Sequence, residues 1–80
     1  MAPDGFPALK PKEVLKILRR LGYVQVAQEG SHRKLDAPGR ARITFAFHDR
    51  REVPPAALRR MLVKNAGLTA DEARDAIRGR

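Results

Sequence analysis

The two histidines, His32 and His48, are the side chains best suited to proton transfer in this 80-residue chain. An imidazole, whose ordinary pKa is about 6.5, takes up and releases protons near neutral pH. Cleavage of an RNA phosphodiester needs a base for the ribose 2′-hydroxyl, an acid for the leaving oxygen, and positive charge near the phosphate. Lys34 and Arg42 would supply that charge. DNA has no 2′-hydroxyl, so this chemistry requires RNA.

Alternation along two short strands predicts that these groups share one sheet face. In residues 32–36, a core-facing Leu35 would leave His32 and Lys34 pointing outward. The strand over residues 42–47 would bury its apolar alternate residues (Ile43, Phe45 and Phe47) and expose the others (Arg42, Thr44, Ala46 and His48). Both histidines and two cations are therefore expected on an open face of the sheet.

The remaining elements must form and cover that sheet. A helix is expected from Pro11 to about Leu21, because apolar residues recur there at helical spacing and Gly22 suits its end. Residues 23–29 alternate as a first strand, with Val24 and Val26 expected on its buried face. A second helix begins at Pro54-Pro55 and a third follows the capping sequence Thr69-Ala70-Asp71-Glu72.

The predicted fold class is α+β, in the order α-β-β-β-α-α. Its three-stranded antiparallel sheet would carry the helices on one face, since such a small sheet is not stable alone. Residues 1–9 are expected to be a flexible lead-in, and residues 10–78 a single domain.

Composition narrows the possible partners. The net charge is +8, and residues 33–64 hold nine Lys and Arg against three acidic residues, a net +6. This concentration of positive charge in the middle of the chain favours a surface that binds phosphates. The alternative is an ordinary solvated face. The chain has no cysteine, and no carboxylates lie at ligand spacing around the histidines, so no metal and no cofactor are expected. No apolar run is long enough to span a membrane, which favours the cytoplasm.

Several segments resemble the HicA toxin family. The resemblance covers nearly all of residues 9–77, and its most specific feature is Gly30-Ser31-His32 followed by Arg33-Lys34-Leu35. The other matching segments are Lys12–Leu18, Leu21-Gly22-Tyr23, Leu58–Leu62 and Ala66-Gly67-Leu68. The resemblance implies a fold like that of double-stranded-RNA-binding domains and an mRNA interferase activity. It also implies that the protein is the toxin of a type II toxin–antitoxin pair, inhibited by an acidic HicB-like antitoxin.

The resemblance implies that His32 is the catalytic residue of a metal-independent endoribonuclease. Around it, we expect Lys34, Arg42 and Arg33 to bind RNA phosphates, and His48 to be a possible second acid or base. Gly30 and Ser31 would form the turn that presents the catalytic imidazole. Two alternatives remain open: a non-catalytic RNA-binding module, and an inactive family member whose main role is to bind an antitoxin-like protein.

Overall fold

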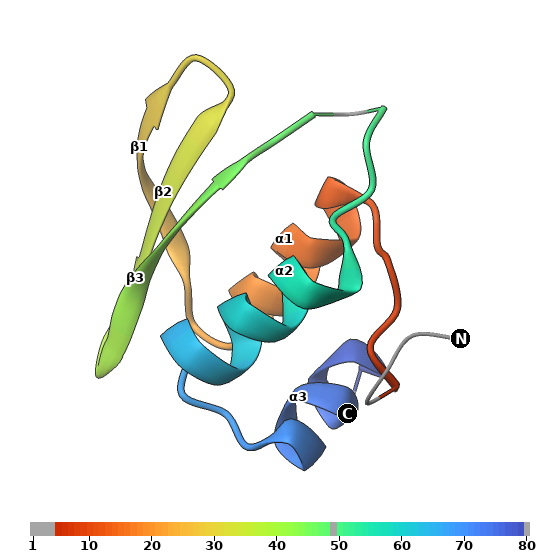
Figure 1. Ribbon diagram of the computed structural model, residues 1–80. Coiled ribbons are helices and arrows are strands. Elements are labelled where there is room, and N and C mark those ends of the chain that lie inside the picture. The colour runs from red at the N-terminus through yellow and green to blue at the C-terminus, as the bar shows by residue number, and fades with distance from the viewer. Residues whose placement is uncertain (1–4, 49, 80) are drawn as a thin grey trace.

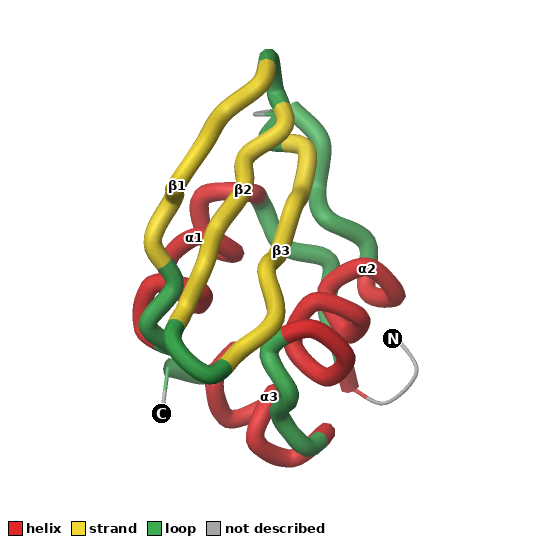
Figure 2. Tube along the Cα trace, turned by 90° about the vertical axis from the view of Figure 1, so that its left-hand side faces the viewer, coloured by secondary structure: helices red, strands yellow, loops and turns green. Residues whose placement is uncertain are grey.

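The computed structural model describes residues 5–48 and 50–79, and it confirms the predicted α+β class (Figure 1). Helices α1 and α2 lie on the same side of a three-stranded antiparallel sheet, and α3 lies below them in both views (Figures 1 and 2). The elements in chain order are α1 (Pro11–Arg20), β1 (Val24–Glu29), β2 (His32–Ala37), β3 (Arg40–Ala46), α2 (Pro55–Arg59), η2 (Arg60–Asn65) and α3 (Ala70–Ile77).

The register of β2 and β3 fixes which side chains share a face. The strand order is β1-β2-β3, and residues paired across an antiparallel ladder point to the same side. Leu35 pairs with Ile43, and both are 1% exposed beneath the helices. Lys34 pairs with Thr44, and His32 with Ala46, on the side away from the helices. We call this side the open face. The predicted places of His32, Lys34, Thr44 and Ala46 on it are confirmed, whereas His48 lies beyond the end of β3.

The first strand differs from the prediction. Val24 and Val26 were expected to be buried, but they are 62% and 50% exposed. Val24 pairs with Asp36 and so belongs to the open face, whereas Gln25 pairs with core-facing Leu35. The register shifts between Gln25 and Ala27, which breaks simple alternation. Because β1 is an edge strand, all six of its residues remain exposed.

The second helix also departs from a regular α-helix. Residues 54–66 were expected to be one helix, but the α-helical part ends at Arg59 and continues as the π-helix η2. At its end, the Ala66 N–H donates to the Met61 carbonyl at 2.9 Å, five residues back. The Ala66 carbonyl in turn accepts a hydrogen bond from Arg40 Nη1 at 2.5 Å. This bond ties the start of β3 to the helical layer.

The N-terminal segment is more ordered than its sequence indicates. Residues 1–9 contain no periodicity and were expected to be flexible. Phe6, however, is 1% exposed within the core, and Leu9 forms an antiparallel bridge with Val53. Residues 5–9 therefore pack as part of the domain, while residues 1–4 of the expected lead-in lie outside the described part of the chain.

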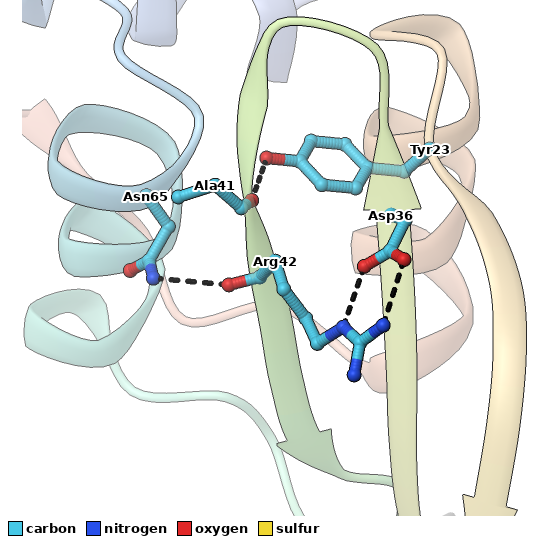
Figure 3. Close-up of polar contacts among 5 residues, drawn as sticks. All are labelled: Tyr23, Asp36, Ala41, Arg42 and Asn65. Carbon is cyan, nitrogen blue, oxygen red and sulfur yellow. Dashed lines mark hydrogen bonds and ion pairs between the residues drawn. The ribbon is translucent and has the colours of Figure 1, made fainter.

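Tyr23 is the largest side chain of the core with a polar end. It is 1% exposed, and its hydroxyl donates to the Ala41 carbonyl at 2.7 Å, joining the start of β1 to β3 (Figure 3). Burial raises the pKa of this phenol, with a smaller lowering by Arg40 and a smaller raising by Asp36. The hydroxyl is thus held neutral in the fold, as a hydrogen-bond donor.

We expect Tyr23→Phe to lower the free energy of unfolding at pH 7 by about 0.5–1.5 kcal/mol, because the Ala41 carbonyl loses its donor. A raised folded-state pKa stabilises the protein below the unfolded value of about 10, and this contribution disappears as the pH rises through the folded value. Urea unfolding at pH 7 and near pH 10.5 should therefore show a smaller alkaline loss for the variant than for the wild type. Equal losses would show that Tyr23 does not carry this pH dependence.

Candidate functional site

The tip of the β1–β2 hairpin extends past the helices (Figure 1), and His32 is the first residue after its turn. It is the first residue of β2, it is exposed, and it belongs to the open face. Its cross-strand partners are Glu29 on β1 and Ala46 on β3. The imidazole is therefore accessible to a large substrate such as a polynucleotide strand, with the carboxylate of Glu29 across the hairpin.

A two-residue turn, Gly30-Ser31, sets the position of His32. Gly30 has φ of +58°, in the left-handed region that glycine adopts most easily, and a Cβ there would meet no atom within 4 Å. The Gly30 carbonyl accepts from Gln28 Nε2 at 3.1 Å, and the Ser31 carbonyl accepts from the Phe47 N–H at 2.7 Å. These bonds fix the turn to both neighbouring strands.

Glu29 is a site residue that the sequence analysis missed. Its Oε1 lies 3.0 Å from Lys34 Nζ, and the two side chains are 74% and 34% exposed. The pKa of the Glu29 carboxyl is lowered, first by the hydrogen bond from Lys34 and then by the charge of Lys34, with a smaller effect of His32. A carboxylate, an imidazole and an ammonium group therefore lie together at the tip of the hairpin. The two-residue turn was the available signal, because the residues flanking such a turn pair with each other.

Arg42 shares the open face but lies near its other end. Its Nε and Nη2 donate to the two carboxylate oxygens of Asp36 at 2.6 and 2.8 Å (Figure 3). The pKa of Asp36 is lowered chiefly by the hydrogen bond from Arg42, and the same bond raises the pKa of Arg42. Arg42 lies four positions before Ala46, the cross-strand partner of His32. Four positions correspond to about 13 Å along a strand. Arg42 and His32 would therefore contact different phosphates.

Arg33 points to the face opposite His32. It pairs with core-facing Phe45, and its guanidinium carbon lies 4.0 Å from the centre of the Phe47 ring, a cation–π contact. Its Nε is buried and has no hydrogen-bond partner in the structure. The structure thus separates Arg33 from the other candidate phosphate ligands.

His48 follows the end of β3, two residues after Ala46, and is exposed. It lines a cavity of about 230 Å³ between β3 and α2, together with eight other residues: Phe45, Ala46, Arg51, Glu52, Val53, Pro54, Ala57 and Met61. The predicted position of His48 on the open face is therefore not confirmed, because His48 lies beyond β3 at the cavity next to α2. Ala46 connects the surroundings of the two histidines, since it lines the cavity and pairs with His32.

The described residues were also compared with the requirements of a metal site and of a membrane-spanning helix. Within residues 5–48 and 50–79, no three His, Cys, Asp or Glu side chains are grouped so that they could hold a metal ion. Among the same residues, no helix has the length and apolar character needed to cross a membrane.

Comparison with protein families decides the assignment. A family model described as the HicA toxin of bacterial toxin–antitoxin systems matches residues 11–68. The chain belongs to the HicA toxin family. Comparison with curated proteins gives no significant match, and comparison with solved structures gives none either.

The HicA match includes the whole sheet and every candidate site residue. It begins with α1 and ends three residues after η2, so only α3 among the helices lies beyond it. The protein is thus a HicA toxin of a toxin–antitoxin system, and this membership implies an antitoxin partner.

Proposed function

We propose that this HicA toxin is an mRNA interferase, an endoribonuclease in which His32 transfers protons without a metal ion. The observation that carries the proposal is the position of His32. His32 is exposed on the open face of a basic domain and lies across the hairpin from Glu29. Lys34, two residues later on β2, points to the same face. Family membership and the net charge of +8 agree with an anionic substrate.

In the proposed reaction, one proton acceptor removes the ribose 2′-hydroxyl proton, and the 2′ oxygen attacks the adjacent phosphorus. The bond to the 5′ oxygen of the next nucleotide breaks, and that oxygen leaves with a proton. His32 performs one of these transfers, and His48 is the candidate for the other. Lys34 stabilises the charge that develops on the phosphate. The products are a 2′,3′-cyclic phosphate and a 5′-hydroxyl.

The remaining basic residues have other roles in this proposal. Arg42 binds a phosphate farther along the open face, at the expense of its contact with Asp36. Gly30 and Ser31 hold the turn that presents His32. Arg33, which lies against Phe47, adds positive charge from the other side of the sheet and makes no contact with the cleaved phosphate.

Incubation of the purified toxin with single-stranded RNA tests the reaction directly. We expect cleavage that persists in excess EDTA and yields fragments with 2′,3′-cyclic phosphate and 5′-hydroxyl ends. Fragments carrying 5′-phosphates, or activity that EDTA removes, would contradict the proposed chemistry. Salt-sensitive RNA binding without fragments would instead identify a non-catalytic RNA-binding module.

We also propose that the antitoxin is an acidic, HicB-like protein that covers the open face. The same face exposes Val24 of β1 and the basic groups Lys34 and Arg42, a combination that suits an acidic protein partner with some apolar surface. Such a partner would block access to His32. Protection of the hairpin amides from hydrogen exchange in the complex would support this position, and protection confined to α3 would contradict it.

Glu29→Gln is expected to strengthen RNA binding by about two- to fivefold at low salt, because it releases Lys34 from its ion pair and removes a negative charge. If Lys34 then contacts one more phosphate, the plot of log affinity against log salt should steepen by about 0.7. Fluorescence anisotropy of a labelled RNA, measured in a His32→Ala background between 50 and 200 mM salt, gives both quantities.

Asp75→Asn on α3 is the matched control, since it removes the same charge from a residue paired with Arg78 far along the chain. If both variants change RNA affinity equally, the effect is one of net charge and Lys34 is not a phosphate ligand.

A further inference from the structure

We propose that the cavity between β3 and α2 binds one nucleobase of the RNA, beside the phosphate that is cleaved at His32. This inference rests on the proposed ribonuclease function and adds to it a site for base recognition.

The size and walls of the cavity suit a single planar ring. Its volume is about 230 Å³, below the roughly 300–1,000 Å³ of pockets that hold drug-sized ligands. Five of its wall residues are apolar and come from β3, α2, η2 and the connection between them: Phe45, Ala46, Val53, Ala57 and Met61. A base turned out of a single strand would remove its apolar faces from water here.

The cavity lies one strand away from His32. Ala46 lines the cavity and is also the cross-strand partner of His32. Neighbouring strands are about 4.8 Å apart, so the backbone of His32 lies about that far from the backbone of Ala46 at the cavity, within the span of one nucleotide. An RNA strand with one phosphate bound at His32 can therefore place the adjoining base over the edge of β3.

The edge of β3 offers polar groups to the base. The Arg42 carbonyl points away from β2, because it accepts from Asn65 Nδ2 at 3.3 Å (Figure 3). Backbone groups repeat their direction every second residue along a strand, so Thr44 and Ala46 present their N–H and C=O to the same edge. Glu52 also lines the cavity, and a carboxylate can accept from an exocyclic amine of a base.

Arginine side chains line the cavities along the same edge of β3. A second, more polar cavity of about 470 Å³ shares Ala57 and Met61 with the first and is lined by Arg42, Arg60 and Asn65. Arg51 lies at the first cavity, and within the described residues neither it nor Arg60 has an ion-pair partner. An apolar cavity flanked by arginines fits a base with its neighbouring phosphates better than an apolar peptide.

The test compares two adjacent alanines of α2. Ala57→Leu fills the shared part of the two cavities, whereas Ala56→Leu adds the same atoms to a neighbouring exposed position outside them. The ligands are 2′-O-methyl trinucleotides, which cannot be cleaved through the 2′ oxygen, and the same molecules with an abasic central residue. Binding is followed by NMR of the alanine and methionine methyl groups.

For the wild type, we expect the intact trinucleotide to bind about tenfold more tightly than the abasic one, with shifts at the methyls of Ala46, Ala57 and Met61. Ala57→Leu should abolish the difference, and Ala56→Leu should keep it. If Ala57→Leu fails to fold, Met61→Ala, which widens the cavity, should reduce the difference instead. Equal binding of the two ligands by the wild type would overturn the proposal.

Cleavage assays separate this proposal from the ribonuclease function. A wild type that cleaves RNA, combined with intact discrimination by Ala57→Leu, would refute the base site alone. A wild type that discriminates the abasic ligand but never cleaves RNA would refute the reaction and leave the base site standing. If Ala57→Leu weakens only binding of the antitoxin, the cavity belongs to a protein interface and the proposal is wrong.

Discussion

His32→Ala is expected to reduce RNA cleavage by about 100- to 10,000-fold, the usual contribution of one positioned acid or base. The loss should be chemical and not structural, because the side chain is exposed and His32 does not belong to the buried core. RNA binding should change by much less than cleavage. Induced expression of the wild type should arrest growth, and the variant should not.

The comparison with His48→Ala shows whether a second group takes part. If His48 supplies the other proton transfer, its variant loses activity by a similar factor, and the double variant loses little more than either single one. Full activity of His48→Ala would remove that histidine from the mechanism. Undiminished cleavage by His32→Ala would remove the proposed function itself.

Leu58→Ala is expected to lower the free energy of unfolding by about 2–5 kcal/mol. Leu58 lies in α2 and is 0% exposed, so truncation leaves a cavity where the helix packs on the sheet. For a chain of this length the total stability is about 4–12 kcal/mol, and the variant should therefore be partly unfolded at growth temperature. Thermal unfolding should show a decrease of more than about 10 °C in Tm.

Leu58→Met is the control for this experiment, because it keeps the volume and should cost less than about 1.5 kcal/mol. A small Tm change in Leu58→Ala would mean that α2 does not depend on this contact. The base site would be affected together with stability, since Ala57 and Met61 belong to the same helical segment.

Alternation predicted β2 and β3 well because both strands have one face covered by helices. Leu35, Ile43 and Phe45 are buried as expected, and their neighbours are exposed or half-buried. The same reasoning failed for β1, where valines are placed at alternate positions but no helix covers them and a bulge changes the register. β-Branched residues at an edge strand satisfy strand propensity without burial.

The site was predictable in part for the same reason. The alternation of side chains along the strands placed His32, Lys34 and Arg42 on the open face. It could not reveal that Asp36 binds Arg42 or that Arg33 stacks on Phe47. Those contacts depend on cross-strand register and on the path of the chain after β3. The cavity between β3 and α2 combines residues distant in sequence, such as Phe45 and Met61, and no local pattern indicates it.

The bulge in β1 has a consequence for the toxin when it is released from its inhibitor. A flat outer strand with exposed valines is a template on which copies of a protein can stack edge to edge and aggregate. The irregularity between Gln25 and Ala27 interrupts the straight run of backbone donors and acceptors that such stacking needs. The bulge thus makes association of two copies through the uncovered strand β1 less favourable.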